Sequence, residues 1–156
     1  MPRNPALVPF SHDHHEALLV ALRLKKGAPS SPHDTLWPIE PIQQSEALLR
    51  FAESELYPHF LLEEEILFPA SINKVVAIDR LIASLLEDHS AMRASLKMLK
   101  TIDSEELVEK MRLFGESLEK HIRREERELF PMIEEQIALG TIILDAEAIQ
   151  NRKKSR

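Results

Sequence analysis

His59-Phe-Leu-Leu-Glu63-Glu-Glu-Ile-Leu-Phe-Pro69 is the stretch that decides the fold of this chain, and His121-Ile-Arg-Arg-Glu125-Glu-Arg-Glu-Leu-Phe-Pro131 repeats it 62 residues later. Both copies have the form H-x3-E-E-x2-L-F-P. On an α-helix, residues four positions apart lie on one face, because one turn takes 3.6 residues. Each copy therefore directs one imidazole and one carboxylate to the same point. Two such helices facing each other would combine side chains typical of a transition-metal site.

The composition restricts both the class of protein and the kind of metal site. The chain has 156 residues, of which 44% are hydrophobic, so it is long enough to bury the core of one domain. It has no cysteine, which excludes disulfides and thiolate or iron–sulfur sites. The net charge of −6 argues against nucleic-acid binding, and no apolar run is long enough to span a membrane. We expect a soluble, cytoplasmic protein with no nucleic-acid or membrane partner. The sequence leaves both a monomer and a homodimer as alternatives.

Hydrophobic periodicity predicts an all-α fold, an up-down-up-down four-helix bundle. The expected helices cover about 11–26, 42–67, 74–100 and 103–140. Ser11 is the expected N-cap of the first helix, and Asp103 with Glu106 resembles a capping box that begins the fourth. Gly27 and Gly140 are expected to end the first and last of them.

The regions between and outside these helices have their own signals. Residues 1–10 form an expected extended lead, residues 11–138 the bundle, and residues 139–156 a short helix, over 141–149, followed by a frayed basic tail. The segment from Gly27 to Pro41 contains four prolines, Pro41 included, and so predicts a long connector, which also holds His33. Pro58 lies within the second helix and predicts a kink there rather than a break, whereas Pro69 is expected to close that helix.

Six polar residues occupy positions where the helical stripes call for leucine or isoleucine. A buried carboxylate costs several kcal/mol unless it is paired or bound to a cation. Each predicted helix contributes one histidine, and two helices add a glutamate one turn later. Buried Glu–His hydrogen bonds without a metal are the alternative explanation. The six candidate metal ligands are His14, His59, Glu63, His89, His121 and Glu125.

The sequence has a further internal symmetry. Asp13-His14 on the first helix matches Asp88-His89 on the third, and each pair precedes one H-x3-E-E copy. We therefore expect a pseudo-twofold bundle with equivalent ligands from its two halves. Four imidazoles then divide between two metals, with Glu63 and Glu125 bridging them. Imidazole and carboxylate ligands with open positions favour iron, with manganese second, while four ligands would saturate a single zinc ion.

Several neighbouring residues compete for a role in this site. His12 or His15 could replace His14, although the match with Asp88-His89 favours His14. Glu64 and Glu126 lie about 100° around the helix from the bridging pair, so a solvated or supporting role is expected for them rather than ligation. Asp13 and Asp88 either orient imidazoles or are surface charges. Three arginines are expected to face solvent: Arg123, Arg124 and Arg127.

The two H-x3-E-E-x2-L-F-P copies and the two Asp-His elements resemble the hemerythrin-like, HHE cation-binding domains, over about residues 10–135. The resemblance implies a four-helix bundle with a carboxylate-bridged di-iron centre, Fe²⁺ or Fe³⁺, oxo- or hydroxo-bridged. By position it carries the ligand role to the same six residues: His14, His59, Glu63, His89, His121 and Glu125.

The chain departs from oxygen-carrying hemerythrins at two places. They have a second histidine four residues after the third-helix histidine, where this chain has Arg93, and an aspartate five residues after the last-helix histidine, where it has Glu126. The set of four His and two Glu is instead similar to that of bacterial iron-centre repair proteins. Those proteins usually carry a cysteine-bearing N-terminal domain, which we do not expect here because the sequence has no cysteine.

The sequence thus predicts a non-haem di-iron protein that binds or senses O₂, NO or iron. The alternative is a di-iron enzyme that detoxifies peroxide or NO or repairs iron centres, so whether the protein is an enzyme stays open. The partners expected are metal ions and a small diatomic ligand, with manganese or zinc ranked behind iron as the metal.

Overall fold

The computed structural model describes residues 2–27 and 37–156, and throughout those residues its regular secondary structure is helical. The predicted all-α fold is confirmed. Five helical runs follow one another: α1 (Val8–Lys26); a second run of α2 (Pro41–Phe51), η1 (Ala52–Leu56), α3 (Tyr57–Leu62), η2 (Glu63–Leu67) and α4 (Phe68–Ser71); α5 (Val76–Met98); a fourth run of α6 (Ser104–Arg124), η3 (Glu125–Leu129) and α7 (Phe130–Ala138); and α8 (Ala146–Lys154).

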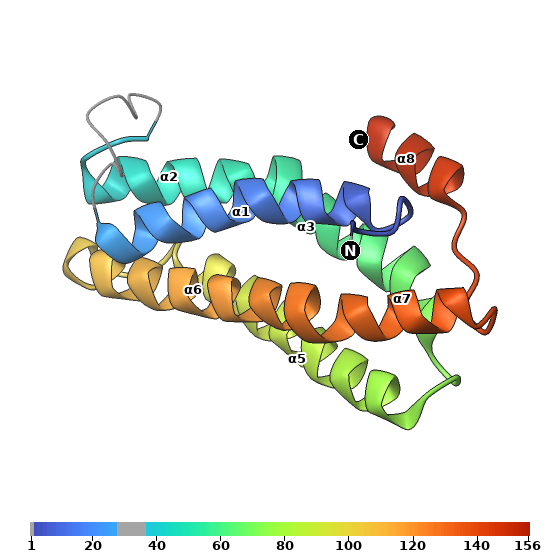
Figure 1. Ribbon diagram of the computed structural model, residues 1–156. Helices are drawn as coiled ribbons and strands as arrows, with labels where there is room; N and C mark the ends of the chain where they lie inside the picture. The colour runs from blue at the N-terminus through green and yellow to red at the C-terminus, as the bar shows by residue number, and fades with distance from the viewer. Residues whose placement is uncertain (1, 28–36) are drawn as a thin grey trace.

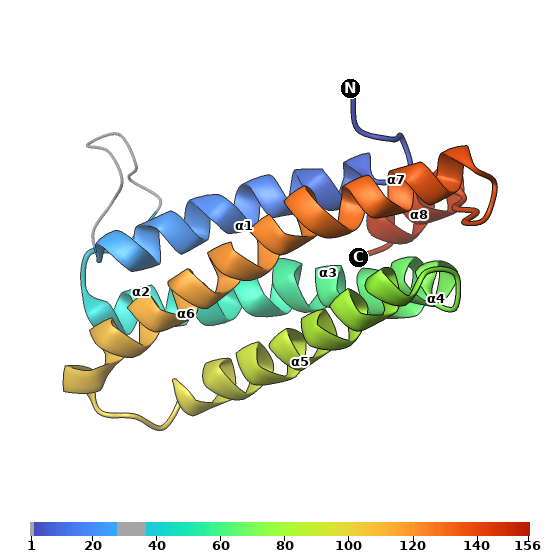
Figure 2. The same ribbon diagram turned by 60° about the horizontal axis from the view of Figure 1, so that its bottom comes forward.

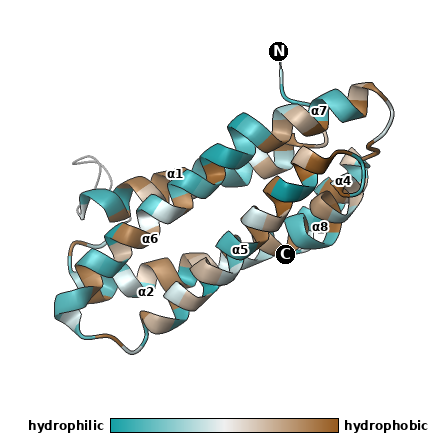
Figure 3. Ribbon diagram, turned by 90° about the horizontal axis from the view of Figure 1, so that it is seen from below, coloured by the Kyte–Doolittle hydropathy of each residue, from teal (hydrophilic) through white to brown (hydrophobic). Residues whose placement is uncertain are grey.

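The four long runs form the predicted bundle, and each is antiparallel to the run before it (Figure 1). The first and last runs of the bundle pack closely, with α1 along α6 (Figure 2). Apolar and polar residues are interspersed along α1, α5 and α6 (Figure 3), as expected for amphipathic helices with one apolar face. Most of the predicted proline-rich connector, His33 included, lies outside the described residues.

The bundle interior consists of two apolar clusters with the polar residues between them. The first cluster lies towards the connector end and includes Leu24, Leu48 and Leu96. The second lies at the opposite end and includes Phe10 and Phe130. All six candidate ligands are buried although they are polar. This polar layer is therefore shielded from water by apolar packing on both sides.

Each of three π-helical turns, η1, η2 and η3, leads directly into an aromatic-proline pair: Tyr57-Pro58, Phe68-Pro69 and Phe130-Pro131. A proline inside a helix lacks an N–H, and its ring collides with the carbonyl four residues back. A π turn widens the helix at that point and relieves the collision. The second run consequently remains helical through Pro58 rather than breaking, and it bends between α2 and α3 (Figure 1). The prediction that Pro69 closes this run is wrong, because α4 continues to Ser71.

Gly115 sets how closely α1 and α6 approach. A Cβ atom at Gly115 would lie 2.9 Å from the backbone oxygen of Ala21 and 3.0 Å from Cβ of Leu24. Ordinary van der Waals contact begins near 3.4 Å, so only glycine allows the helices to pack at this distance. The two helices that contact there also carry His14 and His121.

Of the predicted helix boundaries, the start at Ser11 is wrong, the start at Asp103 lacks its predicted side-chain cap, and the two glycine ends are confirmed. Ser11 is not an N-cap, because α1 begins at Val8; the turn before it is held by Asn4, whose side-chain oxygen accepts from the backbone N–H of Ala6. Asp103 does occupy the N-cap position of α6, yet its side chain makes no capping hydrogen bond. Gly27 and Gly140 follow α1 and α7 with φ of 69° and 78°, the left-handed conformation expected at helix ends.

The short C-terminal helix exists, but it lies later than predicted. It covers Ala146–Lys154 because Asp145 caps it, accepting a hydrogen bond from the Ala148 backbone N–H. Ile149 is fully buried and anchors the helix on the bundle. The prediction of a frayed tail over 151–156 is wrong, since the side chain of Arg156 pairs with Asp13 on α1. Among the described residues, no helix is long and apolar enough to cross a membrane.

Candidate metal centre

The four histidines converge on the bundle axis from four different runs. His14 comes from α1, His59 from α3, His89 from α5 and His121 from α6. Each turns its Nε2 atom inward. The Nε2 atoms of His14 and His59 are 3.1 Å apart, and those of His89 and His121 are 3.2 Å apart. The imidazoles therefore form two close pairs.

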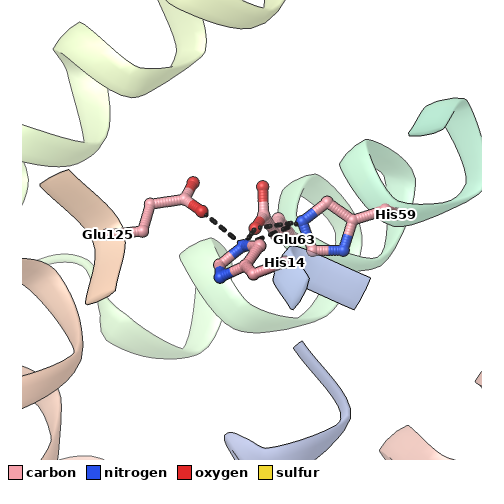
Figure 4. Close-up of side chains that lie close together, drawn as sticks. All are labelled: His14, His59, Glu63 and Glu125. Carbon is pink, nitrogen blue, oxygen red and sulfur yellow. Dashed lines mark hydrogen bonds and ion pairs between the residues drawn. The ribbon is translucent and has the colours of Figure 1, made fainter. Parts of the chain in front are cut away.

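Glu63 and Glu125 lie between the two histidine pairs and contact both. Glu63 Oε1 is 2.8 Å from Nε2 of His59 and 3.4 Å from Nε2 of His14, while its Oε2 is 3.0 Å from Nε2 of His89. Glu125 Oε2 is 2.8 Å from Nε2 of His14 (Figure 4), and its Oε1 is 3.0 Å from Nε2 of His121. Each carboxylate thus presents one oxygen to each pair.

The six residues accordingly make two overlapping groups that share both carboxylates. Within each group, one ligand atom per residue lies within 4.8 Å of all the others. We name the groups subsite A (His14, His59, Glu63 and Glu125) and subsite B (His89, His121, Glu63 and Glu125). This arrangement is consistent with a binuclear metal site.

The repeated motif explains how the local sequence builds the two halves. His59 and Glu63, like His121 and Glu125, are separated by four residues and so share a helix face. Each glutamate is also the first residue of a π turn, and its backbone carbonyl accepts a hydrogen bond from the phenylalanine five residues on. π turns occur often at functional sites, where they reposition a side chain within a helix.

Each imidazole is held from outside by a second carboxylate at Nδ1. Asp13 Oδ2 lies 2.9 Å from Nδ1 of His59, and Asp88 Oδ2 lies 3.0 Å from Nδ1 of His121. The other two contacts are Glu126 to His14 at 2.6 Å and Glu64 to His89 at 2.7 Å. A carboxylate only accepts, so each Nδ1 carries the proton and donates it, which leaves Nε2 as the atom free to bind a metal.

The electrostatics of the layer favour positive charge between the carboxylates. Burial tends to lower the pKa of His121, but the charge of Glu125 and the hydrogen bond to Asp88 outweigh it and raise that pKa to about 10. Burial likewise tends to raise the pKa of Glu63, yet the neighbouring His59 holds that pKa well below its usual range. Both shifts have the same physical origin: buried negative charge that requires a cationic partner.

Protons alone do not meet that requirement. The four oxygens of Glu63 and Glu125 are fully buried and make no hydrogen bond within the described structure. Two N–H groups cannot point at each other across about 3 Å, so His14 and His59 cannot both carry a proton on Nε2, and neither can His89 and His121. A metal ion accepts lone pairs from both members of a pair and from two carboxylate oxygens. The residues present therefore fit two cations with nitrogen and oxygen ligands.

The structure brings together every candidate ligand predicted from the sequence. His14, rather than His12 or His15, enters the layer, because His14 is buried while the other two are exposed. Glu64 and Glu126 are supporting residues that bind imidazoles, as the sequence favoured over ligation. The open question about the two aspartates is resolved as well, since Asp13 and Asp88 both orient imidazoles.

One expectation about the arginines is wrong, and some contacts had no sequence signal. Arg124 does not simply face solvent: it bonds Asp88 Oδ2 at 3.2 Å and the hydroxyl of Ser84. Arg93 donates hydrogen bonds from both Nη atoms to the Glu64 carboxylate, at 2.8 and 3.2 Å. Phe60 stacks on the His89 ring with centroids 3.9 Å apart. These partners come from different helices, so no local spacing in the sequence announces them.

The comparisons with known proteins agree with the geometry of the site. The profile of the hemerythrin HHE cation-binding domain matches residues 7–133, which is most of the chain. No curated protein and no solved structure gives a significant match. The matched region contains all six residues of subsites A and B. The chain belongs to the hemerythrin HHE cation-binding domain family.

Proposed function

We propose that the protein is a non-haem di-iron protein that binds or senses O₂ or NO at subsites A and B. One observation carries this proposal: Glu63 and Glu125 each present one oxygen to each histidine pair, which is the arrangement of a bridging carboxylate. Each subsite then supplies two imidazole nitrogens and two carboxylate oxygens. Iron accepts more than four ligands, so coordination positions remain for a small molecule.

The surroundings of the layer support binding of a small uncharged molecule. Aromatic rings stack on the imidazoles: Phe130 on His14 with centroids 5.5 Å apart, and Phe60 and Phe68 on His89 at 3.9 and 5.9 Å. These rings make an apolar wall, which disfavours charged substrates and strengthens the electrostatic interactions inside it. An apolar wall of this kind suits a neutral diatomic ligand, and the enzymatic alternatives, namely peroxide or NO detoxification and iron-centre repair, are ranked second and separated from binding by turnover.

When bound, the two irons would supply the redox chemistry and the positions that the small molecule occupies. The chain itself contributes three functions. The histidine Nε2 atoms and the two carboxylates hold the metals, the outer carboxylates fix the orientation of each imidazole, and the aromatic rings exclude water.

Metal analysis and visible spectroscopy on protein purified with iron test the proposal. We expect about two irons per chain and visible absorption from a bridged pair. The double variant Glu63→Gln/Glu125→Gln should lose both. Glu65→Gln/Glu128→Gln is the matched control, because these exposed glutamates lie in the same two motif copies and should retain the metal. Protein that takes up no iron, and whose stability does not respond to iron, would refute the proposal.

A second experiment separates binding from turnover. The iron-loaded protein is reduced without oxygen and then given measured amounts of O₂ or NO. A binding or sensing protein takes up a fixed amount per di-iron centre and stops, whereas an enzyme continues to consume the gas with a reductant present. Continued consumption would replace the binding function with the enzymatic one.

A further inference from the structure

The two subsites are backed by cations from different parts of the chain. In subsite B, the carboxylates that orient the histidines are held by residues of the bundle itself: Arg93 on α5 binds Glu64, and Arg124 on α6 binds Asp88. The pseudo-twofold places Leu18 and Leu62 at the positions equivalent to these arginines. Subsite A therefore has no basic residue at the equivalent positions of its own helices.

In subsite A the cations come from segments outside the region that matches the family. Lys153 Nζ lies 3.0 Å from Asp13 Oδ1, and Arg156 Nη2 lies 2.8 Å from Asp13 Oδ2. Both residues belong to α8 and the residues after it, which follow the match over 7–133. On the other side, Arg3 precedes the match and bonds Glu126 at 2.8 Å. The segments on either side of the matched region thus supply the basic side chains that the equivalent positions of the bundle helices do not provide for subsite A.

α8 is placed to act on subsite A through one aspartate, Asp13. It packs against α1 and α3, the helices that carry His14 and His59. Asp13 Oδ2 receives Arg156 on one side and contacts Nδ1 of His59 on the other. The Lys153 ammonium also donates to the Pro9 carbonyl at 2.9 Å, which ties α8 to the first turn of α1. The segment is therefore connected to subsite A through Asp13.

The degree of burial shows that this contact is more than a surface ion pair. The side chain of Asp13 is 11% exposed, whereas its equivalent Asp88 is 35% exposed. The side chains of Lys153 and Arg156 are 21% and 16% exposed. Partly buried charged hydrogen bonds are stronger and less screened by salt than exposed ones. The segment therefore both shields Asp13 from water and fixes the direction of its carboxylate.

We propose that Lys153 and Arg156 are positioning residues for subsite A. The docked α8 would then set the affinity of subsite A for its metal, while Arg93 and Arg124 have the equivalent role in subsite B. This inference rests on the proposed function. Releasing the two cations lets Asp13 turn towards water, and the His59 ring loses the partner that holds Nε2 towards the metal. Loss of a group that directly orients a metal-binding histidine typically costs 10- to 100-fold in affinity. Because Lys153 and Arg156 act through Asp13, the expected loss is smaller, about 3- to 10-fold.

The test compares Lys153→Gln/Arg156→Gln with two control variants of the full chain. Arg152→Gln changes a charge on the same helix, but Arg152 binds the surface residue Glu65 at 3.0 Å and should have no effect on metal affinity. Arg124→Gln removes the equivalent cation of subsite B. Metal-free protein is titrated with Co²⁺, a redox-stable divalent stand-in for Fe²⁺. Calorimetry and the visible bands of Co²⁺ then give the affinity of each subsite.

We expect the double variant to weaken one of the two Co²⁺ sites and Arg124→Gln to weaken the other. Arg156→Lys, which keeps the charge, should restore part of the affinity when compared with Arg156→Gln. Ile149 remains buried in all these variants and keeps α8 docked, which the thermal melt verifies by matching that of Arg152→Gln. Equal weakening of both sites, or no weakening of either, would overturn the proposal.

A readout on the metal-free protein separates this proposal from the proposed function. The ring ¹H–¹⁵N resonances of the histidines report the hydrogen bond at Nδ1. The double variant should shift or broaden the His59 signal and leave that of His121 unchanged. If the unmodified protein takes up no Co²⁺, the proposed function fails, while the His59 signal still decides whether the two cations hold Asp13. An unchanged His59 signal would refute the positioning role.

Discussion

Replacing Gly115 with alanine should push α1 and α6 apart and weaken both the fold and the metal centre. The added Cβ would lie 2.9 Å from the Ala21 carbonyl oxygen, about half an ångström inside ordinary contact. That oxygen is backbone and cannot rotate away, unlike the tip of a flexible side chain. The helices must therefore separate at this point, seven residues along α1 from His14.

The expected cost follows from two opposing effects. Overpacking of a close contact costs typically about 1–3 kcal/mol, and the higher helix propensity of alanine returns about 1 kcal/mol. The free energy of unfolding should fall by about 1 kcal/mol, at most about 2, which lowers the melting temperature by a few degrees in a chain of this size. Separation of the helices should also lengthen the 2.8 Å contact between His14 and Glu125 and weaken metal uptake.

Urea denaturation and metal titration of the Gly115→Ala variant measure the two effects. Ser117→Ala is the matched control, because Ser117 is exposed on the same helix and its substitution tests helix propensity without crowding. If Gly115→Ala is as stable as Ser117→Ala, or more stable than the unmodified protein, then the α1–α6 contact does not restrict the size of residue 115 and the reasoning is refuted.

Three further predictions concern proton release, the pH dependence of stability and the docking of α8. Loading the metal-free protein near pH 8 should release protons, because the pKa of His121 is raised to about 10 and a metal displaces that proton; calorimetry in buffers of different protonation enthalpy measures the release, and a pH-independent affinity would contradict it. In the metal-free protein, the free energy of unfolding should fall at high pH. The raised pKa of His121 contributes stability that is complete below pH 6.5 and is lost as the pH rises through about 10. Asp145→Ala removes the cap of α8 and should cost about 1 kcal/mol locally. Faster hydrogen exchange at the Ile149 amide would show the loss, and unchanged exchange would mean that the cap does not hold the helix.

The helices and the convergence of the polar residues could be predicted because both depend on local spacing. A histidine and a glutamate four residues apart must share a helix face, and a buried stripe must face the bundle axis. Because the motif occurs twice, the sequence also predicted that two such histidine–glutamate pairs meet. For the same reason the family was recognisable from the sequence, and the match over residues 7–133 confirms it.

The outer contacts could not be predicted because they join helices that are distant in sequence. Glu64 points away from Glu63, and which neighbouring helix it meets depends on how the helices cross. Its contact with His89 and Arg93 is a property of the packed bundle. The same holds for residues 151–156: a basic end with no apolar pattern indicates disorder, yet Asp13 on α1 provides its partner. The error at Ser11 has a different origin, since the turn at Asn4 starts the helix earlier than a side-chain cap would.

The outer carboxylates also join the two halves of the chain in a crossed pattern. Glu126, from the second half, holds His14 of the first, and Glu64, from the first half, holds His89 of the second. Subsite A likewise requires Glu125, and subsite B requires Glu63. A two-helix half could complete neither subsite by itself, so an ancestor of that size would have had to work as a pair of identical chains.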